Sequence, residues 1–234
     1  MPTNNTKEST KASTALKGHL TEEENVFFFI PNLIGYARVI LAIVSLYFMR
    51  QHPNICMVLY SLSCLLDAAD GVAARRFNQC SKFGAVLDMV TDRCTTACLL
   101  CYLAIAYQDW AIVFQLLIAL DLSSHYMHMY SSLQSGATSH KKISETSNWF
   151  LRQYYSNNLV LFSVCFANEL FFVLMYLWSF NPSPLHPYIF WALAALTGPV
   201  CAGKQVISVI QMISASKNLA HIDTEERKLL KKAN

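Results

Sequence analysis

Six long apolar runs limit what this chain can fold into. They cover roughly residues 33 to 50, 54 to 78, 84 to 107, 110 to 134, 157 to 180 and 186 to 217. Each run is long enough to cross the hydrocarbon core of a bilayer as a helix, which needs about 20 mostly apolar residues. Only 14% of the 234 residues are charged, too few to cover the surface of a soluble fold of this length. The chain is therefore predicted to be an all-α integral membrane protein with six transmembrane helices.

Lysine and arginine gather on alternate sides of these runs. They precede the first run, occupy the second and fourth connections and follow the last run, whereas the other connections hold only Arg50. Positive residues accumulate in cytosolic loops. The predicted topology therefore places the N- and C-termini in the cytosol, together with the second and fourth connections.

Polar segments flank the predicted membrane domain, which covers residues 25–219. Residues 1–24 are rich in Ser, Thr and charge and cannot bury enough apolar surface to order themselves, so they are predicted to be a disordered cytosolic tail. Residues 220–234 are predicted to be a cytosolic C-terminal tail. Lys231 and Lys232 near its end resemble the dilysine retrieval signal of endoplasmic reticulum membrane proteins. A basic segment attracted to anionic lipid is the alternative.

Four aspartates interrupt the second and third apolar runs. Helical spacing places Asp67 and Asp70 on one face of the second helix, and Asp88 and Asp92 on one face of the third. The connection between these helices is short, so we expect them to be antiparallel neighbours whose acidic faces meet.

Converging carboxylates need compensating positive charge. Each like-charge pair costs about 4 kcal/mol at 4 Å with an effective dielectric of 20, and burial in a membrane adds to this cost. Two Mg²⁺ or Mn²⁺ ions would cancel four negative charges, and ligands that are all hard oxygens favour these ions over zinc. The acids therefore predict a divalent metal centre. An ion site of a cation transporter or channel is the less favoured alternative.

Small residues and an arginine surround the acids. Gly71 and Gly84 add no side-chain bulk, which lets a large ligand lie against the helix backbone. Arg75 lies one turn from the acidic face, where its planar guanidinium can fork onto a phosphate. Metal, arginine and apolar surroundings together indicate a lipid substrate with a diphosphate link.

Other charges also fall inside the predicted spans. Arg38, about one turn inside the first span, is interpreted as extending toward the cytosolic headgroups. Arg93 is expected either to balance the acidic cluster or to pair with another helix. For Asp121, Glu169 and Lys204 we favour ion pairing between helices over a role in a polar substrate pocket.

The acidic stretch resembles the D-x-x-D-G-x-x-A-R-x8-G-x-x-x-D-x-x-x-D signature of the CDP-alcohol phosphatidyltransferases. It matches at every fixed position, namely Asp67, Asp70, Gly71, Ala74, Arg75, Gly84, Asp88 and Asp92. Outside the signature, PNLIGYAR, SSHYMH and NELFF are similar to the eukaryotic phosphatidylinositol synthase branch of that family. The similarity covers most of the chain from about residue 25 onward.

This resemblance implies a reaction and roles for its residues. The family transfers a phosphatidyl group from CDP-diacylglycerol to an alcohol, here myo-inositol, and releases CMP. By resemblance the metal ligands are Asp67, Asp70, Asp88 and Asp92, and Asp92 is also the catalytic base. The implied contacts to CDP-diacylglycerol are Gly71, Arg75 and Ser81.

The sequence also offers candidates for the acceptor pocket. Lys142 and Arg152 in the fourth connection are candidates for the inositol pocket. Glycerol phosphate or serine is the alternative acceptor. The resemblance implies a homodimer in the endoplasmic reticulum membrane, and we expect an active site that faces the cytosol, contacts with membrane lipids and no nucleic-acid partner.

Overall fold

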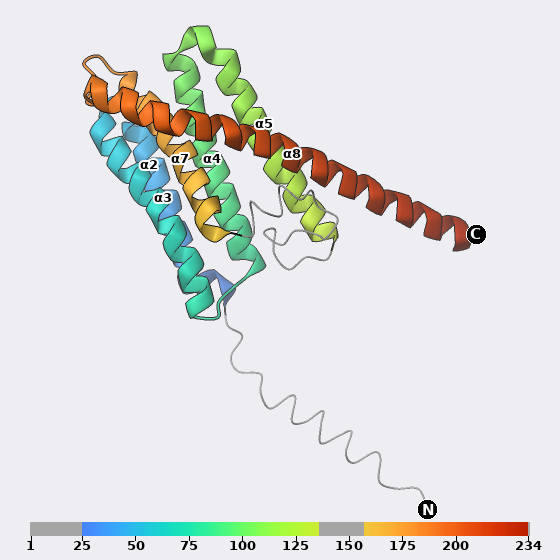
Figure 1. Ribbon diagram of the computed structural model, residues 1–234. Helices are drawn as coiled ribbons and strands as arrows, with labels where there is room; N and C mark the ends of the chain where they lie inside the picture. The colour runs from blue at the N-terminus through green and yellow to red at the C-terminus, as the bar shows by residue number, and fades with distance from the viewer. Residues whose placement is uncertain (1–24, 136–156, 234) are drawn as a thin grey trace, which may run out of the picture.

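The computed structural model describes residues 25–135 and 157–233, and all regular elements in these ranges are helices (Figure 1). In chain order they are η1 (Val26–Phe28), α2 (Ile30–Phe48), α3 (Pro53–Arg76), α4 (Lys82–Ala106), η2 (Gln108–Trp110), α5 (Ala111–Gln134), α7 (Asn158–Trp178) and α8 (Pro187–Ala233). Six helices in these ranges are long and apolar enough to cross a membrane, which confirms the six predicted spans. The predicted tail at residues 1–24 lies outside the described residues.

The starts of the long helices follow from local sequence signals. Pro31, Pro53 and Pro187 lie in the first turns of α2, α3 and α8, where a missing backbone N–H costs nothing. Ser81 caps α4 by accepting a hydrogen bond from the N–H of Gly84 at 2.9 Å. These signals mark the starts of α2, α3, α4 and α8.

Helix α2 lies against both α3 and α4. The acidic side chains of α3 and α4 meet, as the sequence predicts, and the closer backbone packing of each of these helices is against α2. Missing side chains allow this approach: a Cβ on Gly35 would come within 2.8 Å of the Leu87 side chain. A Cβ on Gly84 would come within 2.5 Å of Asn32 Oδ1.

The turn between α3 and α4 is also tied to α2. Asn78 adopts a positive φ of 55°, a conformation that asparagine tolerates better than most residues. The side-chain oxygen of Gln79 then accepts a hydrogen bond from the N–H of Ile30 at 2.9 Å. The beginning of α2 is therefore held at the end of the bundle where α3 ends and α4 begins.

Helices α5, α7 and α8 complete the bundle. Helix α4 packs against α5 and α7, and α8 packs against α5 and α7. Figure 1 shows α8 crossing the other helices obliquely and extending past them. Its 47 residues correspond to about 70 Å. It runs further than the predicted sixth span because residues beyond 217 include good helix formers such as Leu, Lys, Glu and Arg.

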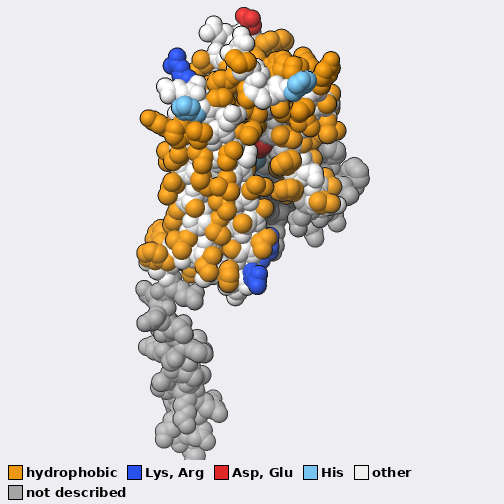
Figure 2. All heavy atoms as spheres, turned by 90° about the vertical axis from the view of Figure 1, so that its left-hand side faces the viewer, with side chains coloured by type: hydrophobic (Ala, Val, Ile, Leu, Met, Phe, Trp, Pro, Cys, Tyr) orange, Lys and Arg blue, Asp and Glu red, His pale blue; other side chains and the backbone are white. Residues whose placement is uncertain are grey.

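Apolar and polar side chains divide the interior. The apolar core gathers where α2, α4 and α7 end and where α3 and α5 begin; its buried members are Met49, Cys56, Tyr60, Leu99, Leu100, Leu103, Phe114, Phe172, Tyr176, Leu177 and Cys201. On the outside, Figure 2 shows one face covered largely by apolar side chains, with Lys and Arg near its two ends. This surface suits a lipid environment.

Adding a methyl group at Gly84 is expected to destabilise the fold, because the new Cβ would collide with the buried Asn32 amide. We expect Gly84→Ala to cost about 1–3 kcal/mol, which lowers Tm by about 2–4 °C per kcal/mol in a chain of this size. Thermal unfolding of the purified protein in detergent measures this. Gly203→Ala is the control, because a Cβ there meets nothing within 4 Å. Equal Tm values for the two variants would contradict the proposed close packing.

Candidate functional site

All four signature aspartates contact one arginine, Arg38 of α2. One guanidinium nitrogen, Nη1, lies 2.6 Å from Asp70 Oδ2 and 2.8 Å from Asp88 Oδ1. The other, Nη2, lies 2.9 Å from Asp67 Oδ1 and 2.5 Å from Asp92 Oδ1. Each nitrogen therefore joins one acid from α3 to one acid from α4. The two acidic faces meet as the sequence predicts, through a residue contributed by a third helix.

This position of Arg38 differs from the expectation. Arg38 is only 1% exposed, so the interpretation that its side chain extends toward the headgroups is wrong. The physical reason is that four carboxylates offer a buried guanidinium more favourable partners than a long path to the membrane surface. The available signal was the spacing of Asn32, Gly35 and Arg38, which places polar and small residues on one face of an apolar helix.

The acidic cluster is closed on one side and open on the other. The Arg38 side chain is 2% exposed and that of Asp70 is 11% exposed, whereas the side chains of Asp67 and Asp92 are 39% and 34% exposed. A ligand can therefore reach the cluster from the side of Asp67 and Asp92. Arg38 lies behind the acids as seen from that opening.

The acids fit a divalent metal ion. Asp67, Asp70 and Asp88 each offer a carboxylate oxygen, and these oxygens all lie within 4.8 Å of one another. A set of hard oxygen donors from partly buried carboxylates suits Mg²⁺ or Mn²⁺. Asp92 joins this group through its contact with Arg38.

The candidate donor-binding residues lie beside the acids on α3 and at the start of α4. The Arg75 guanidinium lies over Gly71, 3.7 Å from where a Cβ of Gly71 would be. The role expected for Gly71 stays a prediction. Gly84 differs, because the Asn32 side chain fills the space beside it. Ser81 uses its oxygen to cap α4, and its hydroxyl hydrogen can still donate to a ligand.

A second charged cluster adjoins Asp92. Arg93 Nη2 lies 3.5 Å from Asp92 Oδ2, and Arg93 Nη1 donates to Asp121 Oδ1 of α5 at 2.9 Å. Lys204 of α8 donates to the same oxygen at 2.6 Å. Arg93 therefore fulfils both roles considered for it, and the predicted ion pairing between helices is confirmed for Asp121 and Lys204.

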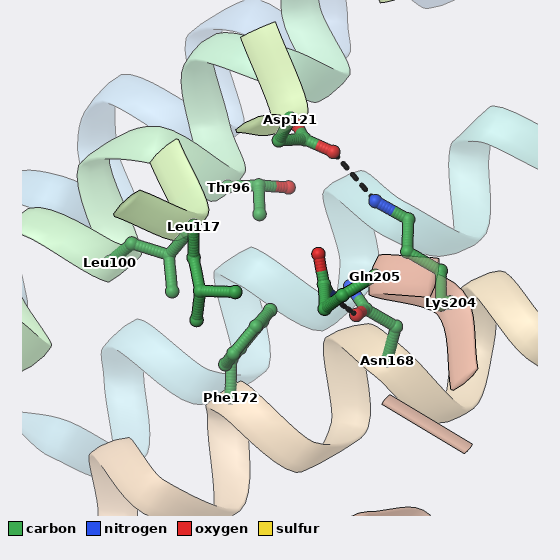
Figure 3. Close-up of a pocket in the computed structure, with 8 residues that line it drawn as sticks. All are labelled: Thr96, Leu100, Leu117, Asp121, Asn168, Phe172, Lys204 and Gln205. Carbon is green, nitrogen blue, oxygen red and sulfur yellow. Dashed lines mark hydrogen bonds and ion pairs between the residues drawn. The ribbon is translucent and has the colours of Figure 1, made fainter. Parts of the chain in front are cut away.

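Glu169 of α7 is held by hydrogen bonds to neighbouring helices. Tyr60 of α3 donates to Glu169 Oε2 at 2.8 Å, and Thr96 of α4 donates to Oε1 at 3.0 Å. A small pocket lies between Thr96 and the second charged cluster, and Figure 3 shows its lining, with Asp121 bonded to Lys204 and Gln205 to Asn168. Polar side chains from α4, α5, α7 and α8 thus meet one turn of α4 beyond Asp92.

The two candidate residues for the acceptor pocket, Lys142 and Arg152, lie outside the described residues. Their predicted role stays a prediction. Lys204, a described cation inside the bundle, forms an ion pair with Asp121.

Removing the acid of the second cluster is expected to destabilise the protein. Asp121→Asn would leave Lys204 buried without its carboxylate partner and Arg93 with only its longer contact to Asp92, at a cost of about 3–5 kcal/mol. Adding Lys204→Met should recover part of this loss, since removing both members of a buried pair costs less than removing one. Thermal unfolding compares these variants with the exposed Asp223→Asn. A Tm for Asp121→Asn equal to that of Asp223→Asn would rule out the structural role.

Known proteins resemble this chain over most of its length. A family model described as CDP-alcohol phosphatidyltransferase matches residues 28–197. A Schizosaccharomyces pombe protein named CDP-diacylglycerol–inositol 3-phosphatidyltransferase is 52% identical over 90% of this chain and 97% of its own length. Proteins of the same name from Mus musculus and Homo sapiens are 48% and 46% identical, each over 88% of this chain and 97% of its own length. No solved structure matches the chain. With its signature aspartates gathered at one site, the chain belongs to the CDP-alcohol phosphatidyltransferase family.

Proposed function

We propose that this protein transfers the phosphatidyl group of CDP-diacylglycerol to myo-inositol, giving phosphatidylinositol and CMP. The observation that carries the proposal is the meeting of four signature aspartates at one partly open site inside a membrane bundle. The names of the relatives in Schizosaccharomyces pombe and Homo sapiens support inositol as the acceptor.

Asp67, Asp70, Asp88 and Asp92 are the proposed ligands of two Mg²⁺ or Mn²⁺ ions. The short distances between the oxygens of the first three acids support this assignment. When bound, such ions supply positive charge that stabilises the phosphates and the departing nucleotide. The protein's own contribution is to hold the carboxylates together and to leave the side of Asp67 and Asp92 open to substrate.

Asp92 is the proposed general base. Its side chain is 34% exposed, so an acceptor hydroxyl can approach it, and contacts to Arg38 and Arg93 hold its two oxygens in place. Asp92 accepts the hydroxyl proton while the hydroxyl oxygen forms a bond to the lipid-linked phosphorus. The bond from that phosphorus to the oxygen of the CMP phosphate breaks, and CMP leaves with the electron pair.

The donor is proposed to lie along the end of α3 and the start of α4. Arg75 is exposed beside Gly71, an arrangement in which the guanidinium can fork onto the diphosphate. Ser81 at the N-cap of α4 offers a further hydroxyl. Gly71 leaves space for the nucleotide to approach the helix backbone.

Charge pairing supports an uncharged acceptor. A phosphorylated acceptor such as glycerol phosphate needs cations that are free to bind it. Among the described residues inside the bundle, Lys204 and Arg93 are both bound to Asp121, so their charges are compensated. Free inositol carries no charge and needs only hydrogen-bonding groups from the protein. Lys142 and Arg152 remain the proposed acceptor residues of the fourth connection.

We also propose a membrane location, an oligomeric state and an orientation for the enzyme. The six apolar helices make it a multi-pass membrane protein. We place it in the endoplasmic reticulum membrane as a homodimer, with its termini and its active site toward the cytosol. The membrane domain is assigned to residues 25–219, with cytosolic tails at residues 1–24 and 220–234.

The proposed function is tested by CMP release from CDP-diacylglycerol by purified protein with Mg²⁺ or Mn²⁺. The acceptors compared are free myo-inositol, inositol phosphate, glycerol phosphate and serine. We expect release to depend on free inositol, and Asp92→Asn to lower its rate by about 10²–10⁴-fold, as expected for loss of a general base.

Asp109→Asn, at an exposed acid in η2, is the matched control and should keep full activity. Release with glycerol phosphate or serine alone would keep the chemistry and change the acceptor. No release with any acceptor, together with metal-dependent ion flux in vesicles, would replace the transferase by an ion transporter.

A further inference from the structure

We infer that Arg38 is a positioning residue whose charge gathers the four aspartates and opposes the binding of divalent ions to them. The part of this inference that concerns ions rests on the proposed metal centre. The part that concerns the four acids rests on the contacts of Arg38 alone.

The contacts of Arg38 form a symmetrical bridge. Nη1 joins Asp70 of α3 to Asp88 of α4, and Nη2 joins Asp67 of α3 to Asp92 of α4. The backbones of α3 and α4 each pack more closely against α2 than against each other, and this guanidinium contacts acids of both helices through both of its nitrogens. A planar group with two forked nitrogens suits this task, whereas a single ammonium would not reach four carboxylates in the same way.

Arg38 is also fixed in place by its surroundings. It is 1% exposed, and its backbone carbonyl accepts a hydrogen bond from the Ser63 hydroxyl of α3 at 3.1 Å. One turn earlier, Gly35 allows α2 to lie close against Leu87 of α4. The backbone of Arg38 is therefore held between the two helices whose acids it joins.

The charges around Arg38 are not balanced by Arg38 alone. Among the described residues, four carboxylates meet one guanidinium, and a second cation, Arg93, lies 3.5 Å from Asp92 and also binds Asp121. Removing the charge of Arg38 would strengthen mutual repulsion among the acids and the attraction of the cluster for cations from solution. Arg38 and divalent ions thus stabilise the same four carboxylates. The positive charge of either one weakens the attraction of the carboxylates for the other.

Arg38 is expected to pre-organise the carboxylates for catalysis. Arg38 holds the four carboxylates together through its own contacts, so the ligand set does not depend on ions for its assembly. Its positive charge lies on the closed side of the cluster, away from the exposed edges of Asp67 and Asp92. It therefore sets how tightly ions are held without occupying the side open to substrate.

The test is thermal unfolding of the full-length protein in detergent, in EDTA and in Mn²⁺, for Arg38→Gln, Arg38→Lys and Arg50→Gln. Arg50→Gln makes the same change at an exposed arginine just beyond α2. In EDTA we expect Arg38→Gln to lower Tm by about 10 °C and Arg50→Gln to leave it unchanged. Mn²⁺ should raise the Tm of Arg38→Gln more than that of wild type, and should bind to it at least about tenfold more tightly.

Each remaining outcome overturns a defined part of the inference. A Tm for Arg38→Gln in EDTA equal to that of Arg50→Gln removes the positioning role. A Mn²⁺ shift that is present but equal in wild type and Arg38→Gln removes the opposition to ions while keeping the metal centre. If Mn²⁺ shifts neither protein, the metal centre fails as well.

Arg38→Lys keeps the inference testable if Arg38→Gln does not fold. It preserves the charge and loses the fork, so its Tm in EDTA and its Mn²⁺ shift should both lie between those of wild type and those expected for Arg38→Gln. Values equal to wild type in both measurements would overturn the claim that the forked geometry holds the acids.

Discussion

Charge inside a membrane must be compensated, and this requirement organises the interior of the protein. Moving an unpaired charge into an apolar bundle is costly, and most of the charged side chains described inside the bundle occur in two groups, while Glu169 accepts hydrogen bonds from Tyr60 and Thr96. Arg38 gathers the four signature aspartates. Asp121 gathers Arg93 and Lys204. Because Arg93 also touches Asp92, the two groups form one polar layer that extends from α2 to α8.

Packing at the ends of the helices supports this layer. The apolar core around Leu99, Leu103 and Tyr176 lies at one end of the bundle. The four aspartates lie toward the opposite end, where α3 ends and α4 begins. There α2 fits closely against α4 because Gly35 and Gly84 have no side chains. The two signature glycines thus differ in role: Gly84 serves packing between helices, and Gly71 leaves space under Arg75.

Much of the fold and of the acidic site could be predicted, and the limits have physical reasons. The apolar runs predicted six helices, and helical spacing alone placed Asp67 with Asp70 and Asp88 with Asp92. The packing of α2 against both α3 and α4 could not be predicted, since a short connection between two helices says nothing about a third helix that packs against them. The partners of Arg38 were missed because an arginine near a helix start equally suits the headgroup region. The acceptor candidates Lys142 and Arg152 remain predictions, because they lie outside the described residues.

The most direct test of the account is a count of divalent ions at the four aspartates. Titration of the purified protein with Mn²⁺, followed by electron paramagnetic resonance, measures the number of bound ions without depending on substrate or turnover. The account predicts two ions per chain, and loss of binding in Asp88→Asn, which removes an acid of the metal-ligand group. An absence of bound Mn²⁺, or binding that Asp88→Asn leaves unchanged, would contradict the assignment of these aspartates as a metal centre.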